Sequence, residues 1–216
     1  MKYRPILFQT EMVQGVLEGR KNQTRRLKGL EEINATPEQY RYQEVSEELP
    51  NIHYFERRDE SGMLTDEYFD IPVPYQVGDV LWVRETFRLE LSAKGNPPLS
   101  TCIYKADYKD VPYKYKWKPS IFMKKMHARI FLEVVNVRAE RLREISENDA
   151  INEGVKYKET RVKKYFWDYI DKRWILNNAR HSFMSLWIKI NGYENLKLNP
   201  FVWIIEFKRI EKPENF

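Results

Sequence analysis

The sequence predicts an α+β fold in which strands form a barrel or sandwich and short helices flank it. Two stretches, 80–85 and 201–207, are apolar on both faces, which is typical of strands buried inside such a layer. A third stretch, 129–138, begins with the alternation of a half-buried strand. The 216 residues suffice for one sizeable core. We therefore expect a single domain, interrupted by insertions.

The first helix is predicted to start at Thr10, a candidate N-cap, and its apolar residues fall on one stripe at helical spacing. Gly19 is expected to end it in the left-handed conformation. The chain then enters a basic stretch, residues 20–26, which holds four cations. Cations this close repel one another, so we expect them to pair with distant carboxylates or to bind an anion. A solvated basic turn is the alternative.

A second helix is predicted from Ser146 to Gly154. Ser146 and Asp149 form a variant of the capping box, and Gly154 ends the helix after about two turns. Glu153 then precedes the cap, where its carboxylate faces the negative end of the helix dipole. Local stability does not explain this placement, whereas a nearby cation would.

The strand at 80–85 follows a tight Gly78-Asp79 turn. We expect Arg84 and Glu85, at its end, to form an ion pair at the rim of the barrel. A helix over residues 179–190 places its aromatic side chains on one face, where they belong to the core.

Two insertions, at about 28–72 and 156–176, interrupt this pattern. The aromatic residues of the first indicate a folded flap, and the second is rich in charge. In the stretch 113–118, cations alternate with aromatic residues. This pattern fits an edge strand with its lysines in water, or else a surface that stacks bases and neutralises phosphates.

Composition narrows the class of protein. Hydrophobic residues make up 42% and charged residues 32%, the mix of a soluble globular chain. The net charge of +5 favours an anionic partner over a cationic one. Cys102 is the single cysteine, and the three histidines do not have the spacing of zinc ligands, so we expect no disulfide, metal or cofactor. No run approaches the roughly 18 apolar residues of a membrane span, and no signal peptide opens the chain, so we expect a cytoplasmic protein.

Five short motifs lie outside the two insertions. They are Gly19-Arg20-Lys21 with Thr24 and Arg26, the stretch 77–85, Trp117 to Ile121, Ile145 to Glu147 with Glu153-Gly154, and the stretch 199–207. In this order they resemble the ASCH family, in the longer form met in phage and prophage genomes. The resemblance implies a PUA-like β-barrel with flanking helices, as one domain over residues 1–216.

Some compact members of that family are similar to amidohydrolases that remove an acyl group from the exocyclic amine of N4-acetylcytidine. They use a lysine and a threonine of a Gly-Arg-Lys-x-x-Thr motif, which Lys21 and Thr24 match in spacing, and a glutamate near a helix end, where Glu153 stands here. The resemblance therefore implies Lys21, Thr24 and Glu153 as catalytic residues. The residues expected to contact the substrate are Arg20, Arg25, Arg26, Trp82, Glu85 and Ser120. The long insertions and the extra arginine at position 25 depart from the compact pattern.

Hydrolysis through Thr24 requires a base, and neutral Lys21 is the candidate because no histidine lies nearby in the sequence. Free lysine titrates near ~10.4, so a pKa of about 7 means destabilising the charged form by roughly 4–5 kcal/mol. Burial beside the neighbouring arginines acts in this direction, and Glu153 at contact distance acts against it. We therefore assign Glu153 to orientation and to proton transfer with the leaving amine or water.

The alternation of a regular strand places residues 21 and 24 on opposite faces, so this mechanism needs a turn or bulge at Asn22-Gln23. Other interpretations stay open. Lys21 and Glu153 could form a purely structural ion pair between the two helices. The domain could bind RNA or a modified base without chemistry, or the same cations could position a phosphate for ribonuclease cleavage. The expected partner is in each functional case a modified nucleoside or RNA.

Overall fold

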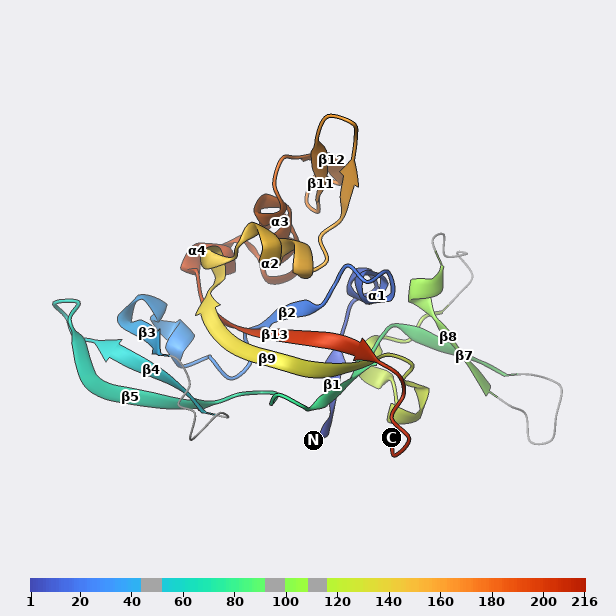
Figure 1. Cartoon of the computed structure of the whole chain (residues 1–216), viewed down its shortest axis with the longest axis horizontal. Helices are drawn as coiled ribbons and strands as arrows, with labels where there is room; N and C mark the ends of the chain where they lie inside the picture. The colour runs from blue at the N-terminus through green and yellow to red at the C-terminus, as the bar shows by residue number, and fades with distance from the viewer. Residues whose placement is uncertain (44–51, 92–99, 109–115) are drawn as a thin grey trace. The chain divides into compact units, whose positions relative to one another are not determined.

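The computed structural model has the predicted α+β class and describes residues 1–43, 52–91, 100–108 and 116–216 (Figure 1). The α-helices are α1 (Thr10–Leu17), α2 (Glu147–Asn152), α3 (Ala179–Asn191) and α4 (Tyr193–Leu198). The strands are β1 (Tyr3–Leu7), β2 (Gln23–Arg26), β3 (Tyr40–Gln43), β4 (Ile52–Arg58), β5 (Leu64–Pro72), β6 (Val80–Arg84), β7 (Phe87–Leu91), β8 (Ser100–Tyr104), β9 (Phe131–Arg141), β10 (Tyr157–Glu159), β11 (Lys164–Asp168), β12 (Arg173–Leu176) and β13 (Phe201–Ile210).

The described chain divides into two compact units, each assembled from segments that are distant in the sequence. The first unit contains Met1–Gly19, Gly78–Glu133 and Lys208–Phe216, and the second contains Arg20–Val77 and Val134–Phe207. Strands β9 and β13 each run from one unit into the other. The units are therefore not successive domains along the chain.

The largest sheet has the strand order β1-β6-β9-β13-β2. Within the described residues no pairing between β1 and β2 closes this sheet. The predicted PUA-like barrel therefore stays a prediction, whereas the mixed α+β class is confirmed.

In the first unit, the predicted strand after Gly78-Asp79 forms as β6. It pairs in parallel with β1, from Tyr3 opposite Val80 onward, and in antiparallel fashion with the start of β9. A small apolar cluster lies on and beside these strands and holds Val80, Ala128 and Phe131. Strands β7 and β8 form a separate antiparallel pair.

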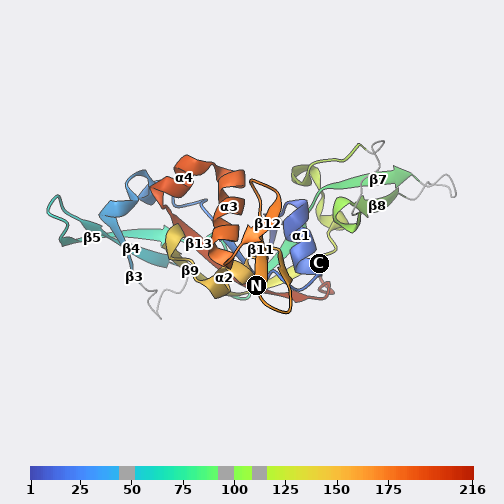
Figure 2. The ribbon, with the colours of Figure 1, turned by 90° about the horizontal axis from the view of Figure 1, so that it is seen from above.

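In the second unit, β2 pairs with β13, from Gln23 opposite Glu206 to Arg26 opposite Trp203. Helices α3 and α4 lie next to each other, and β11 lies beside α3 (Figure 2). The core between these elements and α2 consists of Leu142, Ile145, Ala150, Val155, Phe166, Ala179, Phe183, Trp187 and Val202. The aromatic residues of α3 are core residues, as the helical spacing predicted.

The predicted helix ends are confirmed at α2 and corrected at α1. The Ser146 hydroxyl accepts a hydrogen bond from the Asp149 N–H at 3.0 Å, and Gly154 has a φ of +86°. Gly19 likewise has the predicted positive φ, +73°. The N-cap of α1, however, is Gln9, because the first helical hydrogen bond runs from the Val13 N–H to the Gln9 carbonyl at 3.0 Å. The expectation that Thr10 caps this helix was therefore wrong by one residue.

The described part of the first insertion is a folded flap, as its aromatic residues predicted. It forms a three-stranded antiparallel sheet in the order β3-β4-β5. Phe55 on β4 is fully buried and packs edge to face on Phe201, with ring centroids 5.1 Å apart. The neighbouring His53 is also buried, and its ring lies 4.9 Å from that of Trp203. Strand β4 is thus attached to β13 through aromatic contacts.

The second insertion also folds. It forms a three-stranded antiparallel sheet, β10-β11-β12, which packs on α3 (Figure 1). Phe166 of β11 supplies the buried contact, whereas all three residues of β10 are exposed.

His53 gives a pH-dependent test of the packing of the first insertion. Burial lowers the pKa of its imidazole from 6.5 to about 4. Between these values the unfolded chain takes up a proton that the folded protein does not, so the free energy of unfolding falls as the pH falls, by at most about 3 kcal/mol. We expect urea titrations at about pH 7.5 and about pH 4.5 to show this loss in the wild type and little of it in His53→Gln.

The matched control is His181→Gln, because His181 lies exposed on α3. This variant is expected to lose as much stability in acid as the wild type. An equal acid loss in the wild type and in His53→Gln would contradict a buried, neutral imidazole at position 53.

Candidate functional site

Lys21 and Glu153 are in direct contact in the second unit. The Lys21 ammonium donates to Glu153 Oε2 at 2.8 Å, to the Glu153 carbonyl at 2.9 Å and to the Gln23 carbonyl at 2.7 Å. Lys21 is 4% exposed and Glu153 6% exposed. An ammonium has three protons to donate, so its resting state here is the charged one. The cation that the placement of Glu153 predicted is therefore Lys21.

Backbone pairing brings these two residues together. The main chains of Lys21 and Glu153 form an isolated antiparallel bridge. Beside it, the Asn22 N–H donates to the Asn152 carbonyl at 3.0 Å. Gly154 follows with a φ of +86°, and a Cβ there would lie 2.8 Å from the Lys21 Cβ. Glycine is thus required at position 154 both for the backbone conformation and for the close approach of Lys21.

Arg25 completes the contacts of the Glu153 carboxylate. Its guanidinium lies 3.1 Å from Glu153 Oε1 and 2.5 Å from Glu140 Oε1, and it stacks over the Phe183 ring at 5.3 Å. Both oxygens of Glu153 therefore face a cation. We call Lys21, Arg25, Glu140 and Glu153 the charge cluster.

Within the charge cluster, burial and the neighbouring charges act on the pKa of Lys21 in opposite directions. Burial lowers the pKa of Lys21, the contact with Glu153 raises it, and the positive charges of Arg26 and Arg25 lower it, with a net result below the ordinary 10.5. Burial also lowers the pKa of Arg26. A depressed lysine pKa is the direction that a catalytic base needs.

Asp149 adds a carboxylate at the edge of the cluster. Burial acts to raise its pKa, but the Ser146 hydroxyl and the charges of Arg25 and Arg138 outweigh burial and lower it. Sequence reasoning had assigned Asp149 to capping alone, and it had not included Arg138 or Glu140. All three depend on contacts between residues far apart in the chain, which no local pattern reveals.

Thr24 lies on β2, opposite Ile205 of β13, and is 1% exposed. Strand alternation places its side chain on the face opposite to Arg25 and on the same face as Arg26. Lys21 lies before β2, and its ammonium bonds to the carbonyl of Gln23, the residue next to Thr24. Lys21 thus reaches back to the backbone beside Thr24, whereas the Thr24 side chain lies on the face opposite to Arg25, which binds Glu153. The register of β2 has no bulge, so a meeting of the Lys21 amine with the Thr24 hydroxyl stays a prediction.

The other predicted site residues are divided between the units. In the second unit, Arg20 donates to the Gly154 carbonyl at 2.6 Å. Trp82, Glu85 and Ser120 belong to the first unit. Trp82 packs against the apolar cluster there, and the Ser120 carbonyl accepts from the Met123 N–H at 3.0 Å.

The predicted ion pair between Arg84 and Glu85 was wrong. Glu85 is 1% exposed and binds Arg129 through two hydrogen bonds, of 2.8 and 3.0 Å. Arg84 instead donates to the Ile121 carbonyl. Neighbours on a strand point to opposite faces, so residues 84 and 85 were poorly placed to pair. Burial raises the pKa of Glu85, while Arg129 lowers it, and the net direction is upward.

Of the cation–aromatic stretch 113–118, residues 113–115 lie outside the described residues. Trp117, which is described, packs at 5.9 Å from the ring of Tyr108 and from the guanidinium of Arg88. These contacts pack Trp117 against other side chains of the protein and do not support the predicted role in stacking bases.

A pocket of about 450 Å³ in the second unit shares Glu140 with the charge cluster. Aromatic residues, arginines and glutamates line it together, namely Tyr40, Tyr42, Phe201, Arg41, Arg58, Arg141, Glu38, Glu140 and Glu144. The Arg141 guanidinium lies 5.0 Å over the Phe201 ring. Such a lining can hold a planar ring, while the three glutamates offset the charge of the three arginines.

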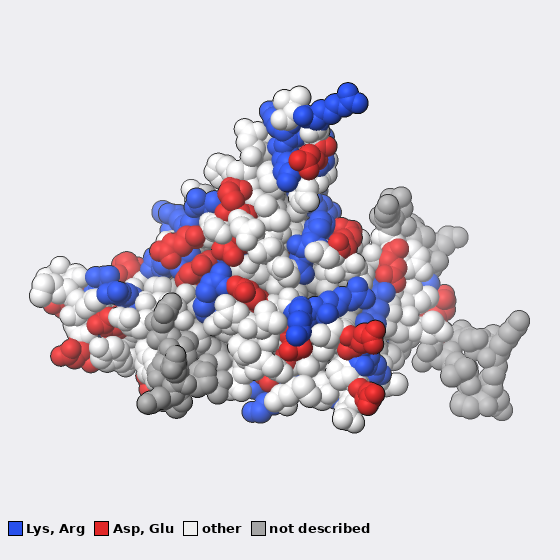
Figure 3. All heavy atoms as spheres, in the orientation of Figure 1, with Lys and Arg blue, Asp and Glu red and all other residues white. Residues whose placement is uncertain are grey.

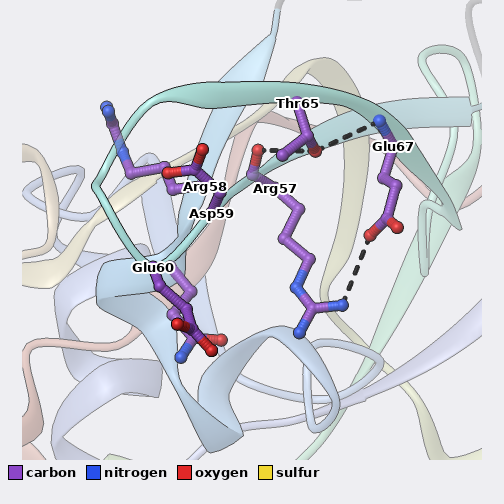
Figure 4. A pocket seen from close by; sticks show the side chains of 7 residues that line it. Arg57, Arg58, Asp59, Glu60, Thr65 and Glu67 are labelled. Atoms are coloured by element: carbon purple, nitrogen blue, oxygen red, sulfur yellow. Dashed lines mark hydrogen bonds and ion pairs between the residues drawn. The ribbon is translucent and has the colours of Figure 1, made fainter.

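A second pocket, of about 320 Å³, lies at the turn between β4 and β5 (Figure 4). Several of its charged groups are paired within the hairpin. Arg57 pairs with Glu67 at 3.3 Å, and Asp59 accepts hydrogen bonds from Ser61 and Met63 within the turn. These contacts stabilise the hairpin and do not form a candidate site.

Among the described residues, no group of three His, Cys, Asp or Glu side chains could hold a metal ion. None of the described helices has the length and apolar character needed to cross a membrane. Comparison of the chain with family models, with curated proteins and with solved structures finds no match. The functional argument therefore depends on the residues themselves.

Gly154 and Gly19 provide a matched pair of substitutions, because each follows a helix, donates its N–H to the carbonyl three residues earlier and has a positive φ, +86° and +73°. A Cβ at Gly19 would meet nothing within 4 Å, so Gly19→Ala measures the backbone cost alone, about 1–2 kcal/mol. Gly154→Ala adds the displacement of Lys21. We expect it to lose at least about 1 kcal/mol more free energy of unfolding in urea titrations. Equal losses in the two variants would contradict the close approach of Lys21.

A double-mutant cycle measures the buried contact. Lys21→Met leaves a buried carboxylate with one cation fewer and should cost about 3 kcal/mol. Because Glu153→Gln removes the same contact, the double variant should lose less than the sum, with a coupling of about 1–3 kcal/mol. The exposed pair Arg57 and Glu67 is the control, and its coupling should stay below about 1 kcal/mol. Equal coupling in both cycles would show that the buried ion pair contributes no more to stability than the exposed one.

Proposed function

We propose that the chain is a cytoplasmic amidohydrolase of the ASCH, PUA-like type that removes an acyl group from N4-acylated cytosine. The observation that carries this proposal is the buried contact between the Lys21 ammonium and Glu153 Oε2, at 2.8 Å. The same ammonium also binds the carbonyl of Gln23, the residue before Thr24. A proton can cross this contact in either direction. The set of residues is the one that the resemblance to the family implies.

The first step transfers a proton within the pair. Lys21 is charged at rest, and a charged amine cannot act as a base. Passing one proton to Glu153 leaves a neutral amine beside a neutral acid, and the burial that lowers the lysine pKa favours this transfer. Arg25 opposes it, because its charge stabilises the carboxylate at 3.1 Å. Arg25 thus tunes the pair and holds Glu153 in place, in addition to the substrate contact that the sequence suggested.

The second step uses Thr24 as the nucleophile. Its oxygen attacks the acyl carbonyl carbon, and its proton goes to Lys21. The carbon–nitrogen bond then breaks, the cytosine amine takes the proton from Glu153, and an acyl-threonine ester remains. Water hydrolyses this ester by the reverse proton path and restores the hydroxyl.

Arg26 is the proposed partner of the oxyanion that forms in these steps. On β2 it lies two residues from Thr24 and on the same face, about 7 Å along the strand. A carbonyl attacked by Thr24 therefore develops its charge within reach of a guanidinium, which lowers the barrier most where water is excluded.

A second candidate function is binding of RNA or a modified base without chemistry. Two observations favour it. The three protons of the Lys21 ammonium are already donated to protein oxygens, and the pocket beside Glu140 offers aromatic rings, among charges of both signs, on which a base can stack. In this case the charge cluster supports the pocket and no proton moves.

Incubation of the purified protein with N4-acetylcytidine, followed by chromatography, separates the two candidates. The hydrolase releases cytidine and acetate. We expect Thr24→Val to lose this activity, whereas Thr24→Ser, which keeps a hydroxyl, retains part of it. Lys21→Arg keeps the charge but not the base and should lose about 10²- to 10⁴-fold in kcat.

The controls decide the outcome. Circular dichroism and urea titration establish that each variant is folded. Absence of turnover by the wild type on the nucleoside and on an oligoribonucleotide containing N4-acetylcytidine would contradict the hydrolase. Full activity of Thr24→Val would contradict the role of Thr24 as the nucleophile.

A further inference from the structure

The outer face of the β10-β11-β12 sheet carries aromatic rings and lysines together. Phe166 of β11 is buried in the core, so its neighbours Tyr165 and Trp167 point to the opposite face of the sheet. Trp174 of β12 lies opposite Trp167, with the two rings 4.9 Å apart. Lys158 of β10, opposite Tyr165, lies over the rings of Tyr165 and Trp174 at 5.7 and 5.4 Å. These four residues therefore share one face.

Lys163, the residue before β11, extends this face, with its amine 4.7 Å from the centre of the Tyr165 ring. We call Lys158, Lys163, Tyr165, Trp167 and Trp174 the aromatic–lysine face. Both lysines are exposed, and within the described residues neither is part of an ion pair.

The segment around this face holds most of the net charge of the protein. Residues 156–176 contain seven Lys and Arg and three Asp and Glu, a net +4 out of +5 for the whole chain. Figure 3 shows Lys and Arg side chains gathered over β11 and β12. A surface of this sign attracts polyanions and is a poor match for a cationic partner.

The aromatic rings of this face favour one class of polyanion over the others. Single-stranded nucleic acid offers unstacked bases to aromatic side chains and phosphates to cations. A duplex hides its base faces, and an acidic peptide would leave the rings unused. The contacts between lysines and rings at this exposed site are worth only about 0.5–1 kcal/mol each, so bases can displace the amines, which then reach phosphates.

We propose that the aromatic–lysine face binds single-stranded nucleic acid, with bases on Tyr165 and the tryptophans and phosphates on Lys158 and Lys163. The face belongs to the same unit as the charge cluster, and β10 begins three residues after Gly154. The binding itself is independent of catalysis. Only the further statement that the bound strand carries the acylated base rests on the proposed function.

Fluorescence anisotropy with labelled, unmodified single strands of about 15 nucleotides tests the binding, with uridine RNA and thymidine DNA as separate arms. We expect tighter binding at about 50 mM than at about 200 mM salt. Lys158→Gln/Lys163→Gln should reduce the salt slope by about 1.4, since each lost phosphate contact removes about 0.7. Tyr165→Ala should weaken binding by about five- to a hundredfold.

Two control variants match these changes outside the face. Lys197→Gln/Lys212→Gln removes two exposed lysines, and Tyr193→Ala removes a tyrosine that is 62% exposed on α4. Both should bind as the wild type does. Because the probe carries no acyl group, failure of deacylation does not affect this result, and failure of binding does not affect turnover of the free nucleoside.

Three outcomes would overturn the proposal. The first is absence of salt-sensitive binding by the wild type to either single strand. The second is unchanged binding by both folded variants of the face. The third is equal displacement of the probe by duplex or by polyglutamate of the same charge, which would show that the face attracts any polyanion. Equal affinity for the RNA and DNA arms supports the proposal as stated, since the bases and phosphates are shared.

Discussion

The contact between Lys21 and Glu153 is the constraint on which the second unit depends. Taking two charges out of water costs several kcal/mol for each ion, and the loss is offset only where geometry and further hydrogen bonds are good. The chain provides them through a backbone bridge, two carbonyl acceptors and a second cation, Arg25. Gly154 allows the approach, and the Ser146 cap fixes the helix that carries Glu153. Removal of one charge leaves the buried groups that it contacted with less compensation.

The same contact connects stability with chemistry. Burial lowers the Lys21 pKa and the contact with Glu153 raises it, so the two influences on this proton act against each other. A residue buried only for stability would be better replaced by an apolar one of similar size. A buried, hydrogen-bonded pair of an amine and a carboxylate is instead suited to proton transfer, which is why we place the catalytic step there. The aromatic–lysine face, in the same unit, would supply affinity for a strand without taking part in the reaction.

Local sequence signals predicted a good part of this arrangement. The turn at Gly78-Asp79, the capping of α2 by Ser146 and the need of Glu153 for a cation all follow from neighbouring residues, and the structure has each of them. The predictions that failed concern contacts between residues that are far apart in the sequence. Glu85 binds Arg129, 44 residues away, in place of its neighbour Arg84. Glu140 joins Arg25 across 115 residues. Pairing at such a distance is decided by the packing of strands, which a single sequence does not reveal.

Nitrogen-15 NMR of the lysine side chains gives the most direct measurement of the central claim. The Nζ signal of Lys21, assigned through its loss in Lys21→Arg, should titrate below the ordinary pKa of 10.5 and exchange its protons slowly with water, because it is buried and hydrogen-bonded. In Glu153→Gln the pKa should fall further, since the carboxylate raises it. A Lys21 signal that titrates like a free lysine and does not respond to Glu153→Gln would contradict the buried pair and the mechanism built on it.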